Sequence, residues 1–207
     1  DCELKLGQRS IEAIRSRVNF SQPNARSAVE ALFRERAYEY VTAYREKGNA
    51  GLAIYRDDSR PTFVANELRS MIDRMPTLMG LMPELRTYLL QYPNATLPNS
   101  TDFLYWQEAQ FGLKPTIRIS HLVIQENANE TVVASKMLYA SHYFWTGLEV
   151  RALVPDPSRG SISTITTVSP AFSFDIEPWP PVIGTPLRPI QAARHTSSRA
   201  ASISVAT

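Results

Sequence analysis

The hydrophobic positions along the chain change their period near its middle. Between residues 25 and 47 the apolar residues recur at steps of three and four, which is the period of an amphipathic helix. This stripe consists of Val29, Leu32, Phe33, Ala37, Tyr40, Val41 and Tyr44. Gly48 follows, and glycine readily adopts the backbone conformation that ends a helix. The pattern predicts one long helix from about Ala25 to Lys47.

Shorter helical patterns lie on both sides of this helix. Ser10 is a suitable N-cap for a short helix with Ile11 and Ile14 on its apolar face. A second amphipathic pattern begins at Phe63 and stops at Pro76. A third begins at Pro83, because proline fits the first turn of a helix. The first half of the chain is therefore expected to be mainly helical.

The second half alternates with a period of two, as strands do. Residues 117–124 and 132–143 each follow this period, and the asparagine-containing segment 126–130 predicts a turn between them. A further strand is expected over 148–154, whereas 103–111 is compatible with a strand or a short helix. The predicted fold class is α+β, with N-terminal helices packed on a C-terminal antiparallel sheet.

Pairing the two central strands about the turn predicts which residues lie opposite one another. Opposite residues share a face of the sheet. The expected pairs are His121 with Lys136, Val123 with Ala134, Ile119 with Leu138, and Ile117 with Ala140. His142 is expected to extend this otherwise apolar face, and Tyr139, Tyr143 and Trp145 to lie on the opposite face.

The character of the chain changes near its end. Residues 1–157 are predicted to form the α+β domain, and residues 158–207 form a tail rich in serine, proline and alanine. Within this tail, 162–168 is compatible with one more strand, and the chain from Pro178 onward is expected to be irregular.

Composition and charge narrow the classes of function. The net charge of +2 argues against nucleic-acid binding, and the lack of a long apolar run argues against a transmembrane segment. The single cysteine, Cys2, has no partner for an internal disulfide. No nucleotide-binding or catalytic motif is present, and the histidines lack a carboxylate at ligand spacing. We therefore expect no cofactor and no metal.

Two segments resemble a family of uncharacterised bacterial proteins. These are FGLKP at Phe111–Pro115 and YASHYF at Tyr139–Phe144, and the likeness extends over about residues 1–157. The resemblance implies a longer, exported protein, which suggests a periplasmic location, a truncated N-terminus and a lost disulfide partner for Cys2. No activity is attached to the family, so the resemblance implies no functional residue.

The sequence is compatible with three functions. The first is binding of a lipid or other hydrophobic small molecule in a cavity between the sheet and the long helix, by analogy with START-like, helix-grip domains. The second is a hydrolase-like enzyme that uses His121 or His142. The third is a protein-interaction module with an exposed apolar face. The candidate ligand-binding residues are His121, Lys136, Tyr139, His142, Tyr143 and Trp145.

Overall fold

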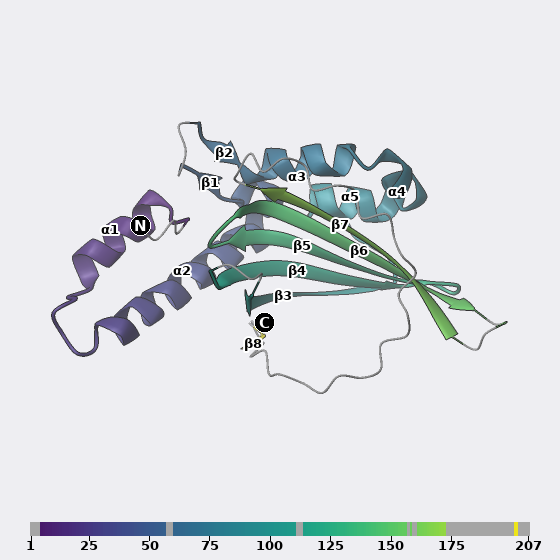
Figure 1. The fold of residues 1–207 in the computed structure, drawn as a ribbon. Coiled ribbons are helices and arrows are strands. Elements are labelled where there is room, and N and C mark those ends of the chain that lie inside the picture. The colour runs from purple at the N-terminus through teal and green to yellow at the C-terminus, as the bar shows by residue number, and fades with distance from the viewer. Residues whose placement is uncertain are drawn as a thin grey trace.

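The computed structural model describes residues 5–56, 60–110, 114–156, 158, 161–172 and 201–202. Helices precede a large antiparallel sheet and cover one of its faces, so the α+β prediction is confirmed (Figure 1). None of the described helices combines the length and the apolar character needed to cross a bilayer.

The helices largely follow the sequence pattern. Their bounds are α1 (Gln8–Arg17), α2 (Ala25–Lys47), the 3-10 helix η1 (Gly48–Gly51), α3 (Val64–Asp73), α4 (Pro76–Leu81) and α5 (Pro83–Gln91). The predicted bounds of α2 are confirmed, and Gly48 ends it with a positive φ of 57°. The prediction that Ser10 caps the first helix is wrong, because Gly7 is the N-cap and its carbonyl accepts a hydrogen bond from the Ser10 amide.

The large sheet has six strands in the order β7-β6-β5-β4-β3-β8. The strands are β3 (Ser100–Ala109), β4 (Thr116–Glu126), β5 (Thr131–Ala140), β6 (Phe144–Asp156), β7 (Ser161–Phe172) and β8 (Ala201–Ser202). A separate pair consists of β1 (Ile54–Tyr55) and β2 (Thr62–Phe63). Apart from β8, the segment from Pro178 onward, where irregular structure is predicted, lies outside the described residues.

The predicted register of β4 against β5 is correct over part of its length. His121 pairs with Lys136 and Val123 with Ala134, as predicted. Beyond Ser120 the pairing shifts by one residue at a β-bulge, so Tyr139, rather than Leu138, lies opposite Ile119. The two predicted pairs of Ile119 with Leu138 and Ile117 with Ala140 are therefore wrong, because an extra residue in one strand changes every later pair.

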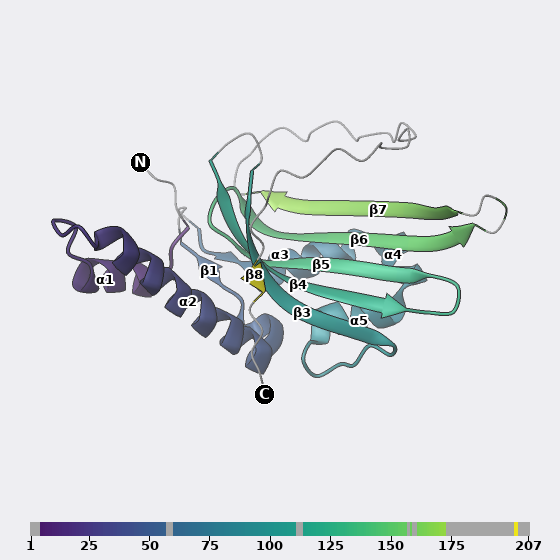
Figure 2. The ribbon, with the colours of Figure 1, turned by 90° about the horizontal axis from the view of Figure 1, so that it is seen from below.

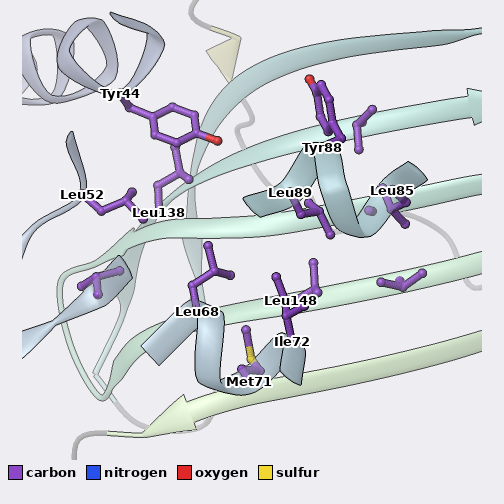
Figure 3. Close-up of a cluster of buried hydrophobic side chains, with 14 of the residues drawn as sticks. Tyr44, Leu52, Leu68, Met71, Ile72, Leu85, Tyr88, Leu89, Leu138 and Leu148 are labelled. Carbon is purple, nitrogen blue, oxygen red and sulfur yellow. The ribbon is translucent and has the colours of Figure 1, made fainter. Parts of the chain in front are cut away.

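The hydrophobic core fills the space between the helices and the sheet. Figure 3 shows Tyr44 of α2, Leu68 and Ile72 of α3, and Leu89 of α5 among the buried side chains. Leu138 and Leu148 lie among the core residues that the sheet contributes. Burial of these apolar side chains away from water supplies most of the free energy that holds the helical layer on the sheet.

The long helix α2 has two different halves. Its C-terminal half lies against the sheet, where the Tyr40 hydroxyl donates a hydrogen bond to the Leu138 carbonyl at 2.7 Å. Its N-terminal half extends with α1 beyond the edge of the sheet, as Figures 1 and 2 show. We call this projection, residues 8–37, the helical arm.

Candidate functional site

A polar hollow lies where the C-terminal ends of α2 and α5 meet α3. It has a volume of about 320 Å³, within the size range of small-ligand pockets. The lining residues are Lys47, Asn49, Ala50, Ala65, Asn66, Arg69, Leu90, Gln91, Tyr92 and Asn94. Four of these ten residues carry a side-chain amide, so we call this hollow the amide pocket.

Gly48 and Asn49 determine the shape of the amide pocket. A side chain at Gly48 would overlap the Tyr92 carbonyl oxygen, so only glycine allows η1 to approach the end of α5 this closely. The Asn49 Nδ2 atom donates hydrogen bonds to the Leu89 and Leu90 carbonyls at 3.1 and 3.0 Å. These carbonyls lie in the last turn of α5, where a helix leaves its carbonyls unpaired. Asn49 is therefore a fixed part of the pocket wall.

The remaining polar groups of the pocket are available to a ligand. Lys47 and Arg69 are exposed, and neither forms an ion pair with any described residue. The side-chain amides of Asn66, Gln91 and Asn94 likewise make no hydrogen bond within the described part of the chain. No lining residue carries a carboxylate. The pocket thus offers two cations and three free amides, which suits an acceptor-rich, negatively charged molecule.

Lys136 lies directly behind Asn49. Its side chain is 1% exposed, and its Nζ atom donates to the Asn49 Oδ1 atom at 3.0 Å and to the Leu89 carbonyl at 3.2 Å. Its Nζ atom also lies 4.8 Å from the centre of the Tyr44 ring. No carboxylate in the described residues forms an ion pair with it. Because burial penalises the ammonium form, the pKa of Lys136 is lowered from 10.5 to about 7.

His121 forms a second buried polar group beside Lys136. Its Nδ1 atom lies 2.8 Å from the Tyr44 hydroxyl, and its Nε2 atom lies 2.8 Å from Asp102 Oδ2. Because an ionised carboxylate only accepts hydrogen bonds, the hydrogen of the neutral ring belongs on Nε2. The Tyr44 hydroxyl then donates to Nδ1. This chain of hydrogen bonds connects α2 with strands β4 and β3.

Burial and hydrogen bonding act on His121 and Asp102 in different ways. Burial lowers the pKa of His121, which keeps its ring neutral, although the Asp102 hydrogen bond opposes this effect. The same hydrogen bond from His121 lowers the pKa of Asp102. The Asp102 side chain is 41% exposed, whereas that of His121 is 2% exposed. Only the carboxylate end of the pair faces solvent, and both ring nitrogens already have partners.

Tyr92 separates the two buried groups from the amide pocket. Tyr92 lines the pocket, and its ring centroid lies 4.6 Å from that of His121 and 5.0 Å from that of Tyr44, on which it stacks. Asn49 separates Lys136 from the pocket in the same manner. The pocket therefore has a rigid rear wall supported by buried polar side chains.

Two of the candidate residues predicted from sequence lie behind the amide pocket, and the described residues place the other four elsewhere. His121 and Lys136 lie side by side behind the amide pocket. The expected position of Tyr139 on the opposite face is wrong, because the bulge turns it toward the helices, where its hydroxyl donates to the Lys5 carbonyl at 2.8 Å. His142 lies beyond the end of β5.

The remaining candidates lie at the connection between β5 and β6. The prediction that β5 continues to Tyr143 is wrong, because β5 ends at Ala140 and Tyr143 has a positive φ of 60°. The Tyr143 hydroxyl accepts a hydrogen bond from the Lys114 amide at 3.0 Å. Trp145 is the second residue of the next strand, β6, and packs partly against the core. These residues do not line the amide pocket.

The sequence reasoning missed the amides and Asp102. Asn49 directly follows Gly48, the glycine that ends α2, so the sequence alone indicates that Asn49 lies near a helix terminus. Asp102 pairs with Val123 and thus shares the face of His121, but only the register of β3 reveals this.

No family model, no curated protein and no solved structure matches the chain.

Proposed function

We propose that this protein binds a small organic anion, a carboxylate or a phosphate ester, in the amide pocket. The observation that carries the proposal is the chemistry of the lining: two cations and three free amides, with no carboxylate among the ten residues. Such a lining has no negative charge to repel an anion, and it supplies many hydrogen-bond donors.

Each lining group has a role in this proposal. The Arg69 guanidinium binds two acceptor oxygens at once, and Lys47 adds a flexible positive charge. The amides of Asn66, Gln91 and Asn94 orient the uncharged part of the ligand through their donors and acceptors. Buried Lys136 adds positive potential from behind Asn49 when it is protonated.

The two functions considered first from the sequence fit the structure less well. Core side chains occupy the space between α2 and the sheet, which is where a lipid cavity was expected. The two buried ring nitrogens of His121 already have partners, which favours a structural role over acid–base chemistry. A hydrophobic ligand, an activity of His121 or His142, and an exported location all stay predictions.

Calorimetric titration with citrate and with glucose 6-phosphate tests the proposal, and glucose serves as the uncharged probe. We expect one binding site per chain for at least one anion, no heat of binding for glucose, and weaker binding as the salt concentration rises. The variant Arg69→Gln should weaken the anion about tenfold. Arg74→Gln is the matched control, because Arg74 is exposed at the end of the same helix but does not line the pocket. Equal affinities for the two variants would contradict the proposal.

A further inference from the structure

A second hollow lies on the helical arm and differs from the amide pocket in chemistry. It has a volume of about 510 Å³ and is lined by Phe20, Ala25, Arg26, Val29, Glu30 and Phe33. Phe20 is 68% exposed, which is unusual for a phenylalanine. We call this hollow the arm groove.

The helical arm is held in place by contacts of its own. The Arg17 guanidinium binds both carboxylate oxygens of Glu35 at 2.9 and 2.8 Å, which joins the end of α1 to α2. Ala13, Val18 and Leu32 are buried in the arm. The residues of the arm groove therefore belong to a part of the chain whose two helices are joined to each other. Figure 2 shows that this part of α2 extends beyond the sheet.

We propose that the arm groove binds the arm groove of a second copy of this chain, so that the two α2 helices lie antiparallel about a two-fold axis. The evidence is the charge pattern of the groove. Arg26 and Glu30 carry opposite charges at neighbouring turns of α2, and their side chains are 92% and 52% exposed. A surface that pairs with itself across a two-fold axis must be self-complementary, and this pair of charges meets that condition.

The spacing along α2 places opposite charges against each other across such an axis. The midpoint between Arg26 and Glu30 is residue 28, so a two-fold axis there sets Arg26 opposite Glu30 of the second copy. Phe20, Val29 and Phe33 belong to the same groove as these two charges, so the two copies would bring their apolar groove residues together around the axis. Dimerisation would then bury Phe20, Val29 and Phe33 and exchange the exposed Arg26–Glu30 pair within each chain for two pairs between chains.

Sedimentation equilibrium of the full 207-residue chain, from micromolar to submillimolar concentration, tests this proposal. We expect a monomer–dimer equilibrium and a dimer that Phe20→Asp weakens at least about tenfold. Phe20 is exposed in a turn, so the substitution leaves the core intact, and circular dichroism verifies the fold.

A charge exchange makes the test specific. Arg26→Glu places two carboxylates opposite each other, and Glu30→Arg places two guanidinium groups opposite each other, so each single change should weaken the dimer. The double variant Arg26→Glu/Glu30→Arg restores opposite charges across the axis and should restore the dimer. A chain that stays monomeric throughout, a dimer that Phe20→Asp leaves unchanged, or a double variant no stronger than the single ones would overturn the proposal.

Discussion

At the scale of single residues, the most informative feature is the pair of buried polar side chains on the sheet, His121 and Lys136. Both lie on a face that otherwise packs against apolar side chains, and both are nearly inaccessible to solvent. Burying such groups is costly unless their hydrogen bonds are satisfied. His121 has partners on both ring nitrogens, whereas within the described residues Lys136 contacts only neutral oxygens and aromatic faces.

The hydroxyl of Tyr44 is expected to contribute to stability through His121. Tyr44→Phe removes the hydrogen-bond donor and leaves buried Nδ1 of His121 unpaired, which should cost about 1–3 kcal/mol of the free energy of unfolding. Urea denaturation measures this loss. Tyr38→Phe on the same helix is the control, because Tyr38 is 52% exposed, and it should change stability by less than about 0.5 kcal/mol. Equal effects of the two changes would contradict the role of Tyr44.

The buried Lys136 predicts a specific pH dependence. Its folded-state pKa of about 7 lies below its usual value of 10.5, so between these values the unfolded chain binds more protons than the folded one. The contribution of Lys136 to the free energy of unfolding should therefore rise with pH, by up to about 1.4 kcal/mol per pH unit. Below about pH 7 both states are protonated, and the full cost of the buried charge remains.

Paired denaturation curves of the wild type and Lys136→Met at pH 7, 8 and 9 measure this effect. The wild type should gain stability relative to the variant across this range. The comparison stays below pH 10 because burial raises the pKa values of Tyr40, Tyr44 and Tyr88, which would add a pH dependence of their own. A constant difference between the two proteins would show that Lys136 keeps its ordinary pKa.

At the scale of elements, the sequence predicted what depends on local pattern. The stripe on α2 and the glycine after it define that helix, and the period of two defines β4 and β5 with the turn between them. The bulge beside Ser120 was not predicted, because an extra residue in a strand depends on packing with its neighbour and leaves the alternation in the sequence nearly unchanged. Because of this bulge, Tyr139 lies on the face of the sheet that the helices cover, and the predicted pairs beyond the bulge are wrong.

The candidate site was less predictable than the fold for the same reason. His121 and Lys136 were found because one hairpin register places them together. Asn49 meets Gln91 and Tyr92 only because η1 and the end of α5 converge in three dimensions, and no spacing in the sequence encodes this.

At the junction between α2 and η1, the close approach of Gly48 to Tyr92 can be tested by substitution. Gly48→Ala adds a methyl group that overlaps the Tyr92 carbonyl at a positive φ, so it should destabilise the protein by more than about 2 kcal/mol and weaken anion binding. Gly80→Ala in α4 is the matched control, since no atom lies within 4 Å of the added carbon. That change should leave stability equal or raise it by about 0.5–1 kcal/mol. Thermal unfolding of both variants distinguishes the two sites, and similar midpoints would contradict this account of Gly48.

At the scale of the whole molecule, the two hollows lie on different parts of the same long helix. The amide pocket lies at the C-terminal end of α2, and the arm groove lies on its N-terminal half. Figure 1 shows that the C-terminal end joins the helical layer over the sheet, whereas the N-terminal half extends beyond the sheet together with α1. The amide pocket is polar and positively charged, whereas the arm groove combines apolar side chains with the oppositely charged Arg26 and Glu30. The arrangement separates a proposed ligand site from a proposed interface, so variants at one should leave the other unchanged.

The most direct measurement of the central claim is a nuclear magnetic resonance titration that follows the side-chain amide signals of Asn66, Gln91 and Asn94 during addition of the anion, citrate or glucose 6-phosphate, that binds more tightly in the calorimetric titration. Because these groups line the pocket and have no partner within the described chain, they report directly on a bound anion. We predict saturable shifts of these signals in the wild type and in Arg74→Gln, and their loss in a Lys47→Gln/Arg69→Gln double variant. Signals that stay unshifted, or that shift equally in the double variant, would contradict the account.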